Sequence, residues 1–225
     1  MAQTNFALAN ALAAQKGPKS AEDKGTLTDQ DRQTIQQLLS QSVNEARASI
    51  ALSPRSARNW EVLASIYRNI AGVAQNALVF SLDSYGRAIQ RDPLNPALRV
   101  NVGGIYYSIK NYDLAIRFFS DAANLKPDYA NAYFNLSIAL RDKGDVQNAK
   151  AVADQAVKLL EVNKDSNDYK IASKLRDELA AKVKDANAQS AASASAAKAD
   201  SALADPNQPD VNVNTDVYKR QLQRG

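Results

Sequence analysis

The apolar and polar positions of the chain recur at an interval that predicts stacked pairs of helices. The segments 99–106 (RVNVGGIY) and 133–140 (YFNLSIAL) match in pattern at an offset of 34 residues, and the same offset relates Ala115 to Ala149. Large residues recur every three or four positions, as on one face of an α-helix, while small residues let a second helix approach closely. This periodicity predicts a solenoid of repeated helix pairs.

Two sets of residues carry a more specific pattern. Residues 60–67 have the order W-x-x-L-A-x-x-Y, formed by Trp60, Leu63, Ala64 and Tyr67. A later unit has aromatic, small and proline residues at the positions that such repeats share: Tyr106, Ala115, Phe119, Ala122 and Pro127. On these residues the chain resembles tetratricopeptide repeat proteins over 57–163. The resemblance implies an all-α fold, a right-handed α-solenoid of antiparallel helix pairs, in which the first helices line a concave groove.

The repeat register divides the first part of the chain. We expect full repeats over 57–95, 96–129 and 130–163, the first with about five extra residues near Gly72 to Asn76. A degenerate repeat is expected over 1–56. Its helices would begin near Ala2 and run over 29–52, with Thr28 as the N-cap of the second helix. The loop 15–27 between them is polar and long, which is typical of an insertion or a site.

The remainder of the chain changes in composition. We expect a capping helix over 164–186 that starts after Ser166 and covers the last apolar surface. Residues 187–215 are rich in Ala, Ser and Asn and predict a disordered tail. Residues 216–221 (DVYKRQ) match one reading frame of a common transposon sequencing adapter, so we interpret 216–225 as an artefact, with a genuine basic tail as the alternative. Because the first repeat begins immediately after Met1, we also interpret Met1 as an internal methionine of a longer gene.

The repeat register also predicts which side chains line the groove. Asn101 and Asn135 are expected to stack along it, and a side-chain amide can hold a peptide backbone because it both donates and accepts hydrogen bonds. Tyr107 and Phe134 are candidate aromatic anchors. The alternative is that these asparagines serve helix packing. The candidate groove residues are Glu61, Ser65, Arg68, Val100, Asn101, Gly104, Tyr107, Ser108, Asn131, Phe134, Asn135, Ile138 and Arg141.

One subclass of the resembled family grips a C-terminal carboxylate with basic and amide side chains. The corresponding positions here are Glu61, Ser65, Asn131 and Asn135, and only the intermediate Asn101 matches. Since Glu61 would repel a carboxylate, we expect no clamp of this kind. The expected partner is instead a protein or peptide segment in the concave groove, bound without catalysis.

The composition argues against catalysis. The chain has no Cys and no His, which removes thiolate nucleophiles, Cys-type metal sites and the commonest general base. Asp142 and Asp145 are close in sequence, but Asp-Lys-Gly-Asp is typical of a turn between helices. No Gly-rich phosphate loop is followed by Lys and Ser or Thr. We therefore expect no enzyme activity, no cofactor and no metal.

Charge and hydropathy narrow the partners further. The 28 basic and 24 acidic residues give a net charge of +4, and removing 216–225 leaves 25 minus 23, or +2. Basic and acidic residues are interleaved, so we expect no nucleic-acid binding. No segment approaches the ~20 apolar residues that cross a bilayer.

A narrower resemblance covers roughly residues 2–160. The segments 3–13 (QTNFALANALA), 27–35 (LTDQDRQTI) and 59–69 (NWEVLASIYRN) resemble the repeat tract that follows the membrane spans in O-antigen ligase/polymerase-like proteins of candidate-phylum bacteria. This resemblance implies the alternative that the chain is the soluble C-terminal part of a polytopic glycan-assembly protein, tethered to a membrane through a missing N-terminal region.

Overall fold

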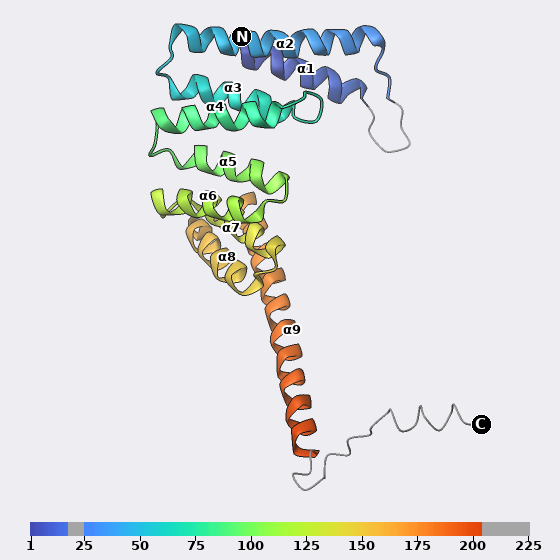
Figure 1. Ribbon diagram of the computed structural model, residues 1–225, viewed down its shortest axis with the longest axis vertical. Helices are drawn as coiled ribbons and strands as arrows, with labels where there is room; N and C mark the ends of the chain where they lie inside the picture. Colours follow the sequence, from blue (N-terminus) through green and yellow to red (C-terminus); the bar gives the residue numbers. More distant parts are fainter. Residues whose placement is uncertain (18–24, 204–225) are drawn as a thin grey trace, which may run out of the picture. The chain divides into compact units, whose positions relative to one another are not determined.

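The computed structural model describes residues 1–17 and 25–203, with side chains through Ser195, and all the regular secondary structure of these residues is helical (Figure 1). The chain divides into two compact units, Met1–Ala180 and Ala181–Gly225, and each is described by itself. In the first unit, antiparallel helices pair and successive pairs stack, which confirms the predicted α-solenoid. The helices are α1 Ala2–Lys16, α2 Asp29–Leu52, α3 Ala57–Asn69, α4 Ala77–Arg91, α5 Pro96–Ser108, α6 Tyr112–Leu125, α7 Ala130–Lys143, α8 Val146–Leu160, a 3₁₀ turn Glu161–Asn163, and α9 Asn167–Leu203.

Side-chain caps start most of these helices. Thr28 Oγ1 accepts a hydrogen bond from the backbone N–H of Asp31 at 3.1 Å, and Asp31 Oδ2 accepts one from the Thr28 N–H at 3.0 Å, so two otherwise unpaired donors are satisfied. Hydrogen bonds from Lys16 and from Thr28 lower the pKa of Asp31 to about 2. Ser166 Oγ accepts from the N–H of Tyr169 at 3.1 Å and starts α9. Both N-caps are those that the sequence predicts.

Small residues set the distance between the helices. Ala64, Ala88, Ala115, Ala139 and Ala149 are fully buried where helices cross. Larger side chains fill the space around them, among them Tyr85, Leu98, Ile105, Phe119 and Leu179. Because an alanine presents only a methyl group, neighbouring helices can approach closely and pack ridges into grooves.

Gly103 on α5 marks one close approach between helices. A Cβ built at this position would lie 2.6 Å from Cε1 of the buried Phe119 ring on α6, which is inside van der Waals contact. The neighbouring Gly104 faces open space, with no heavy atom within 4 Å of an added Cβ. The two glycines therefore serve different purposes: Gly103 admits the Phe119 ring, while Gly104 leaves one face of α5 uncovered.

The connections between paired helices differ in length. Residues 109–111 join α5 to α6, and residues 144–145 join α7 to α8, whereas residues 70–76 join α3 to α4. The longer connection lies where the sequence predicts extra residues. It ends at Asn76, whose φ of 58° places it in the left-handed region that Asn tolerates better than most residues.

The prediction for the end of the chain is wrong over residues 187–203. Helix α9 continues to Leu203, past the expected end at residue 186. The prediction considered only the lack of side chains to bury. Alanine has the highest intrinsic helix propensity, and the segment has no Gly or Pro before Pro206, so the backbone stays helical. Residues 204–215, the proposed artefact at 216–225 and part of the loop 15–27 lie outside the described residues.

The contrast between the two glycines gives a paired test of the packing. Gly103→Ala is expected to lower the free energy of unfolding by about 1–3 kcal/mol, because the added methyl group displaces the Phe119 ring. Gly104→Ala is the matched control and is expected to raise it by about 0.5–1 kcal/mol, because alanine replaces glycine in a helix without a clash. Urea unfolding followed by circular dichroism at 222 nm measures both. Equal effects of the two substitutions would contradict this account of α5 packing.

Candidate functional site

The predicted groove residues lie on the first helices α3, α5 and α7, and none belongs to the buried core. Ser108 and Asn131 are exposed, and the others are half-buried. Those on α3 are Glu61, Ser65 and Arg68; those on α5 are Val100, Asn101, Gly104, Tyr107 and Ser108; those on α7 are Asn131, Phe134, Asn135, Ile138 and Arg141. Their partial exposure leaves them accessible to a ligand, and their role in binding stays a prediction.

Hydrogen bonds connect successive first helices through these residues. Arg68 Nη1 on α3 donates to Asn101 Oδ1 on α5 at 3.2 Å. Between the next two first helices, the Tyr107 hydroxyl on α5 donates to Asp142 Oδ2 on α7. The polar groups of the three helices are thus held in fixed relative positions before any ligand binds.

The two asparagines of the predicted ladder bond to different partners. Asn101 accepts from Arg68, whereas Asn135 Nδ2 donates to the backbone oxygen of Asn131 at 2.7 Å and to its Oδ1 at 2.5 Å. Among the described residues no hydrogen bond joins Asn101 to Asn135 directly. In each amide one group, the oxygen of Asn101 or the nitrogen of Asn135, is hydrogen-bonded within the protein, and the other group can bond to a ligand.

Some candidate residues also stabilise the fold. Val100 packs against the cluster of Ala122, Ala123 and Ala132. Phe134 and Ile138 pack against the core cluster that includes Phe119, Leu136 and Leu179. The hydroxyls of Ser65 and Ser108 donate to carbonyl oxygens of their own helices, at 2.9 and 2.7 Å. The face therefore combines side chains anchored in the core with polar groups at the surface.

Asp142 and Asp145 have structural contacts of their own. Asp142 bonds to Tyr107 and forms an ion pair with Arg141, Oδ1 to Nε 2.7 Å, which raises the pKa of the Arg141 guanidinium. Asp145 is the N-cap of α8, since its Oδ1 accepts from the Asn148 N–H at 3.2 Å. The interpretation of Asp-Lys-Gly-Asp as an interhelical turn is confirmed, with Gly144 at a φ of 98°.

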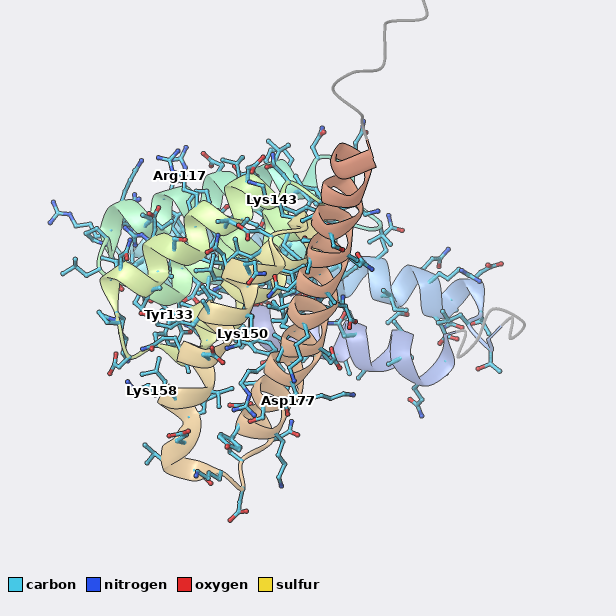
Figure 2. All side chains as sticks on the ribbon, turned by 90° about the horizontal axis from the view of Figure 1, so that it is seen from below. Arg117, Tyr133, Lys143, Lys150, Lys158 and Asp177 are labelled. Carbon is cyan, nitrogen blue, oxygen red and sulfur yellow. The ribbon has the colours of Figure 1, made fainter. Side chains whose placement is uncertain are left out.

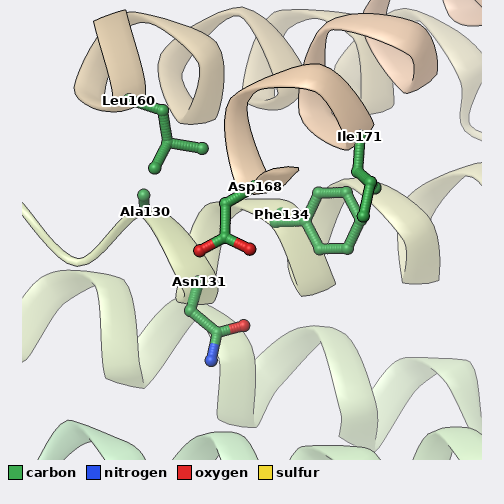
Figure 3. A pocket seen from close by; sticks show the side chains of 6 residues that line it. All are labelled: Ala130, Asn131, Phe134, Leu160, Asp168 and Ile171. Atoms are coloured by element: carbon green, nitrogen blue, oxygen red, sulfur yellow. The ribbon is translucent and has the colours of Figure 1, made fainter. Parts of the chain in front are cut away.

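A pocket of about 280 Å³ lies between α7, the end of α8 and the start of α9 (Figure 3). It includes two of the predicted groove residues, Asn131 and Phe134, together with Ala130, Leu160, Asp168 and Ile171. Sequence reasoning missed Asp168 and Ile171 because it treated the helix after residue 163 only as a cap, and it missed Ala130 and Leu160 because it named only positions expected to face the concave groove. The 34-residue period gave no signal for Asp168, because α9 begins 37 residues after α7.

Charged side chains of both signs share the surface of α6 to α9. Figure 2 shows them directed outward from the helices, with Lys143, Lys150 and Asp177 among those labelled. Lys143 Nζ pairs with Asp113 Oδ1 at 2.6 Å, and Lys150 Nζ pairs with Asp154 Oδ2 at 2.7 Å. Basic side chains here are thus neutralised locally by carboxylates, in keeping with the interleaved charges of the sequence.

Two kinds of feature are absent from the described part of the chain. Within 1–17 and 25–203 no helix is both long and apolar enough to span a bilayer. Over the same ranges, no three or more Asp or Glu residues gather in a way that could hold a metal ion.

Comparison with known proteins identifies the repeats. A family model described as "Tetratricopeptide repeat" matches residues 97–129 and 130–159, so the chain contains tetratricopeptide repeats. Two solved structures match with a TM-score of 0.50. One is a crystal structure of MamA, 16% identical, covering 75% of this chain and 98% of that one. The other is the TPR2B-domain:pHsp70-complex of yeast Sti1, 14% identical, covering 56% and 97%. At these identities the likeness shows the fold alone.

Two curated proteins match short parts of the chain. A probable UDP-N-acetylglucosamine–peptide N-acetylglucosaminyltransferase SEC of Arabidopsis thaliana is 32% identical over 69 residues, which are 31% of this chain and 7% of that protein. The BBSome complex member BBS4 of Bos taurus is 31% identical over 85 residues, or 38% and 16%. The chain therefore spans only a small part of the length of either relative.

The link between α5 and α7 can be tested by titration. The hydrogen bond to Asp142, together with burial, raises the pKa of the Tyr107 phenol above its ordinary value near 10. We expect Asp142→Asn to lower that pKa, because an amide stabilises the neutral phenol less than a carboxylate does. Asp113→Asn, which removes a carboxylate paired with Lys143, is the control and should leave it unchanged. NMR of the Tyr107 ring carbon across pH 8–12 measures the pKa of the phenol. Identical Tyr107 titrations in the Asp142 variant and the native chain would disprove the hydrogen bond from Tyr107 to Asp142.

Proposed function

We propose that the chain is a non-catalytic scaffold that binds an extended protein segment along the first-helix face of α3, α5 and α7. The observation that carries the proposal is the set of half-buried polar and aromatic side chains on these three helices. The hydrogen bonds from Arg68 to Asn101 and from Tyr107 to Asp142 fix their positions. A preorganised surface loses less conformational entropy on binding, which favours association.

The two asparagines supply complementary groups to a peptide backbone. Asn101 Oδ1 is occupied by Arg68, so its N–H groups are the ones that can donate to a peptide carbonyl. Asn135 uses its Nδ2 toward Asn131, so its Oδ1 is the group that can accept from a peptide N–H. Because these bonds involve only the ligand backbone, they tolerate many peptide sequences. Tyr107 and Phe134 are the neighbouring aromatic contacts that we assign to apolar side chains of the segment.

The open side of α5 makes room for such a segment. Gly104 has no heavy atom within 4 Å of an added Cβ, so the space in front of this helix is not filled by the protein itself. A solved structure of the same fold is the complex of the TPR2B domain of yeast Sti1 with pHsp70. That neighbour supports the proposal that this fold presents a surface to a protein partner.

The electrostatics of α3 favour a segment without a terminal carboxylate at this end. Glu61 Oε2 pairs with Arg58 Nη1 at 2.9 Å, so this arginine is already engaged by the protein and is not free to bind a terminal carboxylate. We therefore propose recognition of an internal segment of the partner rather than its C-terminus.

Two other functions have less support. Enzyme activity would need carboxylates free to act on a substrate, and the contacts of Asp142 and Asp145 assign both to the fold. The soluble part of a polytopic glycan-assembly protein rests on the sequence resemblance over residues 2–160 alone. Neither the fold nor the proteins that match it add support for that origin.

The groove is tested by removing both amides. Asn101→Ala combined with Asn135→Ala is expected to weaken binding of a peptide selected by the native chain about tenfold, because two backbone hydrogen bonds worth about 0.5–1.5 kcal/mol each are lost. Gln90→Ala combined with Asn124→Ala removes two exposed amides from the second helices α4 and α6 and is the matched control. Fluorescence anisotropy measures the Kd, with helicity checked by circular dichroism. Equal Kd values for the two double variants would rule out the asparagine contacts.

A further inference from the structure

We infer that the pocket between α7 and α9 receives a cationic side chain, lysine or arginine, of the bound segment. This inference rests on the proposed function and adds the chemistry of one residue of the partner. The pocket shares Asn131 and Phe134 with the first-helix face, so it continues that face beyond α7. A segment lying across α3, α5 and α7 would reach it next.

The lining of the pocket has an apolar wall and one polar corner. Phe134, Leu160 and Ile171 form the wall, and Asp168 and Asn131 form the corner (Figure 3). Its volume of about 280 Å³ lies at or below the roughly 300–1,000 Å³ typical of small-molecule sites. The size suits a single side chain better than a cofactor.

Asp168 is the charged residue of this lining, and its charge is not compensated by the protein. Among the described residues no ion pair or hydrogen bond of the Asp168 side chain is found. The acidic residues of the other first helices differ, since Glu61 pairs with Arg58 and Asp142 with Arg141. The uncompensated carboxylate is exposed and lies where a ligand can reach it.

A lysine or arginine side chain matches this arrangement along its whole length. Its methylene stem can lie on Phe134, Leu160 and Ile171, as long basic side chains commonly bury their stems on apolar surfaces. Its charged end can then reach Asp168, with the Phe134 ring adding a cation–π contact. An acidic side chain would be repelled by Asp168, and an apolar one would remove water from that carboxylate without replacing the lost hydrogen bonds.

The position of Asp168 within its helix supports the same assignment. Asp168 is the second residue of α9, as Asn131 is the second residue of α7. Both residues line the pocket, so the start of α9 adds an acidic side chain beside the polar Asn131.

The test uses the full chain and a phage-displayed library of random 12-residue peptides. Peptides selected by the native chain are expected to share a lysine or arginine at one position. For a synthetic peptide from that selection, replacing the lysine with norleucine should raise the Kd about fivefold. Asp168→Asn should raise the Kd of the lysine peptide by a similar factor and make the norleucine replacement nearly neutral. Asp165→Asn, which removes an exposed carboxylate outside the pocket, is the matched control and should change neither value.

The outcomes separate this inference from the proposed function. Selected peptides with no shared cation, or an equal norleucine effect in the native chain and Asp168→Asn, would overturn the cationic pocket while groove binding stands. Failure of the native chain to enrich any peptide would overturn both. The norleucine peptide tests the pocket with the native chain, so the result does not depend on whether Asp168→Asn folds.

Discussion

The close approach of neighbouring helices is the constraint on which the rest of this structure depends. Alanines with no exposed surface lie at the crossings, and Gly103 admits the ring of Phe119 where even a methyl group would clash. Close packing of this kind fixes the separation of α3, α5 and α7 and so the spacing of the side chains that they present. The Arg68–Asn101 and Tyr107–Asp142 hydrogen bonds can form because that spacing is set by the core.

Repetition explains why the sequence predicted the fold so well. A 34-residue period places equivalent residues in equivalent environments, so one recognised unit predicts its neighbours. Local signals were also clear: Thr28 and Ser166 start helices because their hydroxyls satisfy backbone donors, and both caps are present. The end of α9 was mispredicted because the segment after residue 186 has few side chains to bury, yet its many alanines favour a helix without burial.

The candidate site was less accessible to sequence reasoning. The register identified which positions face outward, but it could not show that Asn101 bonds to Arg68 while Asn135 bonds within its own helix. Those contacts depend on side-chain conformations that adjacent repeats do not share. Asp168 was missed for another reason: α9 begins 37 residues after α7, so the 34-residue period does not continue into it and no repeat position indicated this residue. The structure adds that position by placing Asp168 and Phe134 in one pocket.

The most direct measurement of the central claim is the mapping of a bound peptide by backbone amide NMR of the full chain. A peptide selected by the native chain is titrated into the labelled protein, and the shift of each amide is recorded. The account predicts the largest changes on the first helices, around Asn101, Tyr107 and Phe134, with small changes on α4, α6 and α8. Changes concentrated on α4, α6 and α8, with the first helices unaffected, would contradict it.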